Sequence, residues 1–417
     1  MMKNRWIRFC LPVLCLLLLT GCAEARRVII NTSPDPLPEP QRPAVQELPA
    51  PDVQPELDAP EKAVLAAEES VQPEEPEAPL LEKTGELRML GVPVTVLTDG
   101  ETRYVSAAET LRAAGLDVQE EDGSLSFELD GLCELESGSP VFMRGGVQTD
   151  MKAKAWLQED DLYAPLDMLT ELLSLEYGIT EAGTEYYAKR TALGEIPPNV
   201  NVPILMYHAV SDDCWGYTEL FVSPSEMEKQ LAWLTENGYD AIWMEDLDHL
   251  EDYDKPVILT FDDGYDDNYT ELFPLLKKYN VKATFFVIAG SFGQPHKMTA
   301  EQVTEVAQSG LVSVQSHSMT HPYLNSISEA DLEWELGECQ RVIASLTGKI
   351  PNVICYPSGG YNQLTIDVAK RNGYDYGIRM AGYLYNTSVD PFHIQRCYIA
   401  RESSLEEFKS YLMLSGG

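Results

Sequence analysis

The sequence predicts an α/β fold for the C-terminal half of the chain, preceded by a small α+β domain and a disordered linker. From about residue 199 onward, runs typical of strands alternate with amphipathic helical patterns. Three polar motifs follow directly after predicted strands, and a segment rich in proline and acidic residues separates these regions from the N-terminus. Repeated strand-helix units imply a parallel sheet, and their number favours closure into a barrel.

The first 21 residues have the organisation of a secretory signal peptide. Lys3, Arg5 and Arg8 precede an apolar stretch that ends at Leu19 and is too short to span a bilayer comfortably. The string Leu19-Thr-Gly-Cys22 resembles a bacterial lipobox, which implies cleavage before Cys22 and lipidation of its thiol. We therefore expect an extracytoplasmic protein, anchored to the bacterial cell membrane by lipid on Cys22. An ordinary secretory signal with a chance cysteine is the alternative.

Residues 22–84 are expected to form a disordered linker rich in proline and glutamate. Within this segment, residues 31–80 contain 12 prolines, 12 acidic residues and no aromatic residue. Such a composition buries too little apolar surface to fold, and proline together with like charges keeps the chain extended. We interpret the segment as a tether that holds the following domains away from the membrane.

Residues 85–192 are expected to form a small α+β domain, because short β-prone runs alternate there with helical patterns. The stretch from Tyr104 to Leu116 resembles the stretch from Tyr163 to Leu175: each combines a strand end with a helix that has an apolar stripe. This pattern resembles the stalk domain related to the N-terminal region of copper amine oxidases. The region lacks histidine and clustered cysteine, so no copper chemistry is expected. A spacer or wall-adhesion role is favoured over catalysis.

Charge and cysteine content narrow the functional classes. The formal net charge of −37 argues against nucleic acid and anionic membranes as direct partners, and suits a neutral or cationic glycan better. Five cysteines follow Cys22, and since they form no CxxC pair, a cysteine-based zinc site is not expected. A disulfide among Cys339, Cys355 and Cys397 is left open by the sequence.

Residues 199–417 are expected to form the catalytic domain. Capping residues mark several helix starts: Ser223 with Pro224 at the first helical position, Thr299, and Ser328. Expected strands cover residues 202–206, 256–261, 283–288, 311–315, 352–355 and 375–378, and expected helices begin near residues 224, 268, 300 and 328, with a further helix ending near residue 372. The polar motifs fall at the C-terminal ends of three strands, where a parallel barrel gathers its active site.

The first two of these polar motifs are Thr260-Phe-Asp-Asp-Gly-Tyr265 and His317-Ser-Met-Thr-His321-Pro322. Together they supply the components of a mononuclear metal site for hydrolysis. Asp262 and Asp263 are adjacent at a strand end and point in different directions, so that one can bind metal while the other acts as a base. His317 and His321 are four residues apart, close enough to face a single ion. Two imidazoles and one carboxylate leave coordination positions open for water and substrate, as in catalytic sites.

The order and spacing of these strings resemble the polysaccharide deacetylases of carbohydrate esterase family 4. The resemblance covers about residues 200–400, includes the opening string Pro203-Ile-Leu-Met-Tyr-His208, and implies a distorted (β/α) barrel that hydrolyses N-acetyl groups on glycans. It assigns Asp262 as the catalytic base. It assigns Asp263, His317 and His321 as ligands of a divalent metal, usually Zn²⁺. It also implies that the turn at Tyr356-Pro-Ser-Gly359 lines the acetyl pocket, with the N–H of Ser358 stabilising the oxyanion.

The chain also departs from that family pattern. Many members carry an arginine that orients the base two residues before the turn proline, where this chain has Cys355. The usual general-acid string near the C-terminus is absent. His393 is a candidate for the acid, against an exposed loop histidine. Arg396 is a candidate for the missing arginine, against a structural ion pair. His208 is interpreted as a structural or substrate-cleft residue.

The expected function is metal-dependent removal of N-acetyl groups from a cell-wall or extracellular polysaccharide. The expected substrate is peptidoglycan or a polymer of N-acetylglucosamine, with Zn²⁺ as the metal and Co²⁺ or Ni²⁺ as alternatives. An O-acetyl carbohydrate esterase is the nearest enzymatic alternative. A non-catalytic wall-glycan-binding lipoprotein is the alternative from a different class, and the absent arginine and general acid motivate it.

Overall fold

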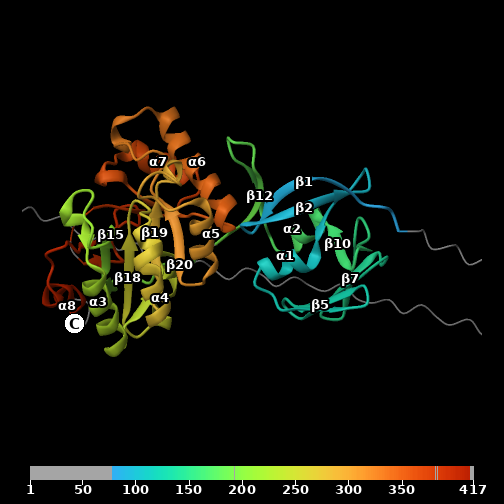
Figure 1. The fold of residues 1–417 in the computed structure, drawn as a ribbon, viewed down its shortest axis with the longest axis horizontal. Helices are drawn as coiled ribbons and strands as arrows, with labels where there is room; N and C mark the ends of the chain where they lie inside the picture. The colour runs from blue at the N-terminus through green and yellow to red at the C-terminus, as the bar shows by residue number, and fades with distance from the viewer. Residues whose placement is uncertain (1–77, 192, 381, 383, 414–417) are drawn as a thin grey trace, which may run out of the picture. The chain divides into compact units, whose positions relative to one another are not determined.

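The computed structural model describes residues 78–191, 193–380, 382 and 384–413 (Figure 1). The signal peptide, Cys22 and the linker up to residue 77 lie outside the described residues, so their expected roles stay predictions. Across the described ranges, no helix combines the length and apolar character needed to cross a bilayer. The described cysteines are all free, which leaves no disulfide among Cys339, Cys355 and Cys397.

Residues 82–190 build two sheets and two short helices, with a buried core of their own. The first sheet has the order β11-β12-β1-β2-β3-β10-β9, and the second runs from β4 to β8 in sequence order. The first sheet contains β1 (Glu82–Met89), β2 (Val92–Thr98), β3 (Arg103–Ser106), β9 (Trp156–Gln158), β10 (Asp161–Pro165), β11 (Glu176–Ile179) and β12 (Glu185–Arg190). The second contains β4 (Val118–Glu121), β5 (Ser124–Glu128), β6 (Leu132–Glu136), β7 (Val141–Arg144) and β8 (Val147–Asp150).

The internal sequence echo corresponds to two strand-helix units in this region. Helix α1 (Ala107–Ala113) follows β3, and α2 (Leu166–Leu172) follows β10. The two strands pair antiparallel, so the repeated units lie next to each other. Strand β1 begins at Glu82, within the segment expected to be linker, because Glu82 and Lys83 pair with the end of β2. Pairing with β2 thus holds Glu82 and Lys83 in a strand, although their local composition does not predict one.

Residues 201–413 form a parallel sheet flanked by helices. Its order is β23-β22-β20-β19-β18-β14-β25, with β17 also paired to β18, and Figure 1 shows β18, β19 and β20 side by side. The sheet contains β14 (Ile204–Tyr207), β17 (Asp240–Ile242), β18 (Pro256–Phe261), β19 (Ala283–Val287), β20 (Val312–Ser316), β22 (Val353–Cys355), β23 (Tyr376–Ile378) and β25 (Cys397–Tyr398). Shorter strands are β13 (Asn201–Val202), β15 (Ala209–Val210), β16 (Phe221–Val222), β21 (Lys349–Ile350) and β24 (Tyr385–Asn386).

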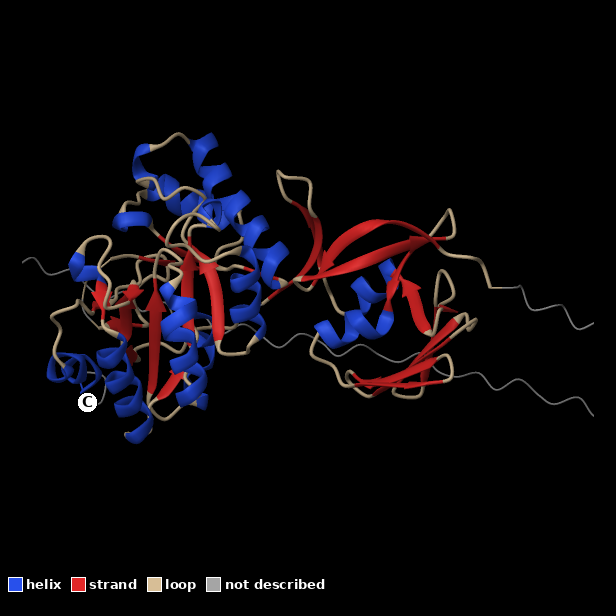
Figure 2. Cartoon of the chain, in the orientation of Figure 1, coloured by secondary structure: helices blue, strands red, loops and turns tan. Residues whose placement is uncertain are grey.

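The helices pack apolar faces against this sheet (Figure 2). Ser223, Thr299 and Ser328 cap their helices as the sequence predicts, each accepting a hydrogen bond from an amide of the first turn. The α-helices are α3 (Pro224–Glu236), α4 (Phe273–Tyr279), α5 (Ala300–Gln308), α6 (Glu329–Thr347), α7 (Gln363–Arg371) and α8 (Leu405–Met413). Shorter helical segments are η1 (Thr218–Leu220), η2 (Met244–Asp252), η3 (Asn268–Leu272), η4 (Ala289–Ser291), η5 (Leu324–Ser326) and η6 (Pro357–Gly359).

The segment from Ile394 to Tyr398 connects the two edges of the parallel sheet. Ile394 forms a parallel bridge with Ile378 at the end of β23, and β25 pairs parallel with β14 at the opposite edge. The sheet is therefore curved into a distorted barrel that an irregular segment closes, and the predicted fold class is confirmed.

Candidate active site

Four polar motifs lie at the C-terminal ends of strands in the parallel sheet. β14 is followed by His208, β18 by Asp262 and Asp263, β20 by His317, and β22 by the turn that starts at Tyr356. Since these strands are parallel, their C-terminal ends meet at one edge of the sheet. The fold therefore brings together side chains that lie far apart in the sequence.

Asp263, His317 and His321 converge on one point. The Oδ1 atom of Asp263 lies 3.5 Å from Nε2 of His317 and 3.5 Å from Nε2 of His321. One ligand atom from each residue lies within 4.8 Å of the others. Convergence of two imidazole nitrogens and one carboxylate oxygen on a common space is the arrangement that a divalent cation requires. These three side chains fit the metal implied by the family resemblance.

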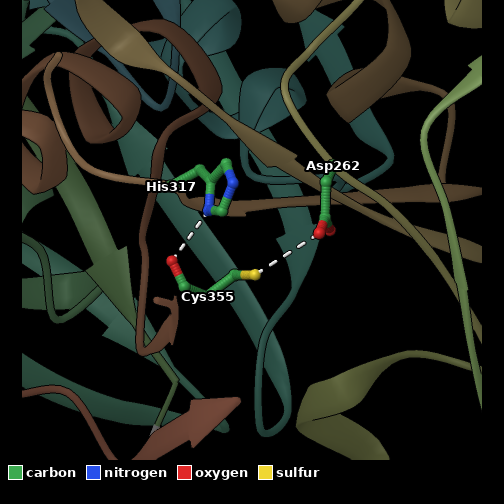
Figure 3. A group of neighbouring side chains, drawn as sticks. All are labelled: Asp262, His317 and Cys355. Atoms are coloured by element: carbon green, nitrogen blue, oxygen red, sulfur yellow. Dashed lines mark hydrogen bonds between the residues drawn. The ribbon is translucent and has the colours of Figure 1, made fainter. Parts of the chain in front are cut away.

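The hydrogen bonding of His317 sets which of its ring nitrogens is available to bind metal. Its Nδ1 lies 2.7 Å from the carbonyl oxygen of Cys355, as Figure 3 shows. A carbonyl only accepts hydrogen bonds, so Nδ1 carries the proton and the Nε2 lone pair is free. Burial lowers the pKa of His317 to about 4, which keeps the ring neutral. The imidazole is thus prepared as a metal ligand.

The loop that carries His321 is held by a glutamate from helix α6. Thr320 donates to the Glu335 carboxylate through its backbone N–H at 2.9 Å and also through its hydroxyl. The backbone N–H of His321 donates to the hydroxyl of Ser318 at 3.0 Å. Both Ser318 and His321 have a φ of +64°, and Asp263 has a φ of +73°, a region that non-glycine residues rarely adopt. Such strain at three positions in and beside the site indicates that the surrounding contacts enforce the geometry.

Arg396 binds both carboxylate oxygens of Asp262. Its Nη1 and Nη2 atoms each lie 2.7 Å from one oxygen of that carboxylate. The guanidinium also donates to the hydroxyl of Thr260 at 2.9 Å and to the carbonyl of Arg379 at 3.2 Å. The thiol of Cys355 lies 3.2 Å from Nη2 of Arg396 and 3.6 Å from Asp262. Figure 3 shows the contact between Cys355 and Asp262. The guanidinium therefore reaches Asp262 from the barrel-closing segment, and Cys355 leaves room for it.

Electrostatics keep Asp262 ionised despite its burial. Burial alone would raise its pKa, but the Arg396 guanidinium outweighs that effect and holds the pKa well below the ordinary value. Burial likewise opposes the charge on Arg396, and the adjacent Asp262 carboxylate raises its pKa above the ordinary value. Both side chains are almost fully inaccessible to solvent. A bidentate, buried pair of this kind fixes the orientation of the carboxylate.

Within the described residues, the contacts of His393 are with Asp390 and Tyr361 and not with Asp263, His317 or His321. Its ring lies 3.4 Å from the Asp390 carboxylate and packs edge-on against Tyr361 at a centroid distance of 5.5 Å. Burial alternates along residues 392–396: residues 392, 394 and 396 are buried, and residues 393 and 395 are partly exposed. This period of two directs Arg396 inward and His393 outward. The role of His393 as general acid therefore stays a prediction that its contacts with Asp390 and Tyr361 do not support.

His208, interpreted from the sequence as a structural or substrate-cleft residue, lies next to Asp262 in the structure. Its Nε2 lies 3.9 Å from Oδ2 of Asp262, and its ring is nearly buried. Nδ1 of His208 is buried without a hydrogen-bond partner among the residues that the structure describes. Burial is the main cause that lowers the pKa of His208 below its ordinary value. Its position directly after a strand, like that of Asp262 and His317, was the signal available in the sequence.

Ser358 lies in the turn that follows β22. Its backbone has a φ of +51°, and its side chain is exposed. The amides of Gly359 and Gly360 donate to Tyr356 and Pro357, whereas the Ser358 amide has no acceptor within the described ranges. An uncommitted N–H at the rim of the site is consistent with the expected oxyanion role.

Comparisons with known proteins identify the family. The polysaccharide deacetylase family model matches residues 249–377. The protein YxkH of Bacillus subtilis (strain 168), assigned as a polysaccharide deacetylase, is 32% identical over 216 residues, which cover 51% of this chain and 76% of that relative. The poly-β-1,6-N-acetyl-D-glucosamine N-deacetylase of Escherichia coli O157:H7 is 26% identical over 298 residues, covering 59% of this chain and 44% of the relative. The structure of the Streptococcus pyogenes deacetylase PplD in complex with acetate has 29% identity and a TM-score of 0.49, and the match covers 51% of this chain and 99% of that one.

The match to YxkH extends over most of that relative's length, and the family model spans the strand ends that carry Asp262, Asp263, His317 and His321. This chain belongs to the polysaccharide deacetylase family.

Proposed function

We propose that this protein is a metal-dependent hydrolase that removes N-acetyl groups from a cell-wall or extracellular polysaccharide. The observation that carries the proposal is the convergence of Asp263, His317 and His321 beside a carboxylate, Asp262, that a buried guanidinium holds in place. Relatives from Escherichia coli and Staphylococcus aureus are named as poly-β-1,6-N-acetyl-D-glucosamine N-deacetylases. The proposed substrate is therefore a polymer of N-acetylglucosamine, with peptidoglycan as the alternative.

The donor set suits Zn²⁺, with Co²⁺ and Ni²⁺ as alternatives. When bound, such an ion would polarise the acetyl carbonyl and make water more acidic. Asp262 is the proposed base, since it is ionised and its orientation is fixed. It accepts a proton from the water that attacks the acetyl carbon. The Ser358 N–H is the proposed donor to the oxyanion that forms on the acetyl oxygen.

His208 is the proposed general acid. Asp262 has a depressed pKa, so a proton that it accepts is readily passed on, and His208 Nε2 is the neighbouring group at 3.9 Å. Because burial lowers the pKa of His208, the imidazolium formed on taking up that proton is a strong acid and can deliver the proton to the leaving amine. Cleavage of the carbon–nitrogen bond then yields acetate and the free amine of the sugar.

The proposal extends to the location of the protein. The lipobox-like string ending at Cys22 supports lipid anchoring to the outer face of a bacterial cell membrane. Residues 22–77 would act as a tether, and the β-rich region before residue 192 as a spacer or wall-contacting domain. Labelling cells with a radioactive fatty acid tests the anchor, because Cys22→Ala should abolish incorporation.

The activity is tested by acetate release from defined glycans. The zinc-loaded protein is incubated with β-1,4- and β-1,6-linked N-acetylglucosamine oligomers and with peptidoglycan. Acetate release that Asp262→Asn abolishes, with the metal content unchanged, is the expected result. Release of acetate from acetyl-xylan alone would assign an O-acetyl esterase instead. The missing arginine was one reason to consider a non-catalytic binding role, and the contact of Arg396 with Asp262 removes that reason. If the metal-loaded protein released no acetate from any glycan, the non-catalytic role would be favoured.

A further inference from the structure

The turn that carries Ser358 contacts an exposed apolar side chain on each of two sides. A Cβ atom added at Gly360 would lie 3.0 Å from Cδ1 of Tyr323, and one added at Gly359 would lie 3.4 Å from Cβ of Met380. Tyr323 and Met380 therefore pack against consecutive glycines of the same turn. Ser358, the exposed residue of the turn, directly precedes these two glycines.

Both side chains are more exposed than large apolar residues usually are. Tyr323 is 61% exposed and Met380 is 43% exposed. Exposed apolar groups next to converging polar groups are typical of ligand-binding surfaces. The two side chains are therefore candidates for contact with substrate.

The backbone that carries the Tyr323 ring is held firmly. Its carbonyl accepts hydrogen bonds from the N–H of Ser326 at 2.9 Å and from the hydroxyl of Ser326 at 2.7 Å. The next residue, Leu324, is completely buried. Tyr323 also follows the metal-binding residue His321 by two positions. The backbone that presents the ring is thus fixed close in the chain to His321, which limits the entropy lost when a ligand packs on it.

We propose that Tyr323 and Met380 form a stacking platform for a pyranose ring of the glycan, a proposal that rests on the proposed function. A β-linked N-acetylglucosamine unit has its hydroxyl and acetamido groups at the ring edge and C–H bonds on its two faces. One apolar face packs on the Tyr323 ring while the acetamido group at the edge enters the turn at Ser358. An axial hydroxyl on the face that meets the platform would lift the ring from it. The platform therefore favours sugars whose contacting face carries only C–H bonds, as both faces of a β-linked N-acetylglucosamine unit do.

Binding measurements test the platform separately from catalysis. The zinc-loaded protein carrying Asp262→Asn is titrated calorimetrically with β-1,4- and β-1,6-linked tetramers of N-acetylglucosamine. Tyr323→Leu, which keeps apolar volume but removes the ring, should weaken binding of the preferred tetramer by about three- to tenfold, as expected for an aromatic contact. Tyr323→Phe should bind within about twofold of the parent. Tyr177→Ala, at a tyrosine in β11 that is 55% exposed, is the matched control and should change nothing.

Zinc content is measured for each variant, because Tyr323 is close to His321 in the chain. If Tyr323→Leu loses zinc, tetramer binding is measured with Met380→Ala and Gly360→Ala instead. The methyl group of Gly360→Ala displaces the Tyr323 ring without removing it. Tetramer affinities equal to the parent in zinc-loaded Tyr323→Leu, or in both substitute variants, would overturn the proposal, as would no binding of either tetramer. Failure of the unmutated protein to release acetate counts against the proposed function alone.

Discussion

Replacing Arg396 by methionine should strongly destabilise the barrel, because it leaves a buried carboxylate without its partner. The guanidinium makes two bonds of 2.7 Å to Asp262. Hydrogen bonds to charged groups contribute about 1.5–3 kcal/mol each. Removing one partner of a buried ion pair costs about 3–5 kcal/mol in total. We therefore expect Arg396→Met to lower the free energy of unfolding by about 3–5 kcal/mol at neutral pH.

The pH dependence of this loss has a definite sign. In the wild-type protein the pKa of Asp262 is depressed, so its favourable contribution is present above the unfolded pKa and is lost only as the pH falls through the low folded value. Without Arg396, burial is left to raise the pKa of Asp262 above the unfolded value. The folded variant then takes up a proton as the pH falls. The difference in unfolding free energy between the wild-type protein and Arg396→Met should therefore shrink as the pH is lowered from 7 toward 4.

Urea unfolding at several pH values measures this effect, with two controls. Arg401→Met removes another arginine of the same region, which donates to the carbonyls of Ser211 and Phe221, and should cost only about 1 kcal/mol. Combining Arg396→Met with Asp262→Asn should restore part of the lost stability, because no unpaired charge remains. An equal cost of Arg396→Met in both backgrounds would refute the reasoning. Cys355→Arg should restore part of the activity of Arg396→Met, since the Cys355 thiol lies 3.6 Å from Asp262.

Three further predictions concern other parts of the catalytic domain. Glu335→Ala should weaken zinc affinity by about 10- to 100-fold in a competitive chelator titration, because its carboxylate holds Thr320 in the histidine loop; unchanged affinity would contradict this role. Gly377→Ala should cost about 1–3 kcal/mol in chemical unfolding, since a Cβ atom there would lie 2.0 Å from the hydroxyl oxygen of buried Tyr356, and a neutral effect would show that the ring moves freely. Burial raises the pKa of Asp267 to about 6, so its charge destabilises the fold above that pH, and Asp267→Asn should raise the melting temperature at pH 8 with a gain that fades toward pH 4; a gain independent of pH would exclude this cause.

The sequence determined the elements and the core of the site, because the signals that encode them are local. Helix caps at Ser223, Thr299 and Ser328 and the apolar strands that precede the polar motifs are readable within a few residues. Parallel strands bring their C-terminal ends to one edge, so the positions of Asp263 and His317 directly after strands, with His321 four residues beyond His317, already implied that they would meet.

Only the tertiary structure decided which partners complete the site. Arg396 lies 134 positions from Asp262 in the chain, and the bond between them depends on the segment that closes the barrel. The alternation of that segment directs Arg396 inward and His393 outward, a choice that composition does not reveal. The role proposed for His208 rests on its distance to Asp262, and the role proposed for Tyr323 rests on its contact with the turn at Ser358. Contacts of this kind depend on how distant segments close on one another, whereas local sequence patterns reflect only the preferences of neighbouring residues.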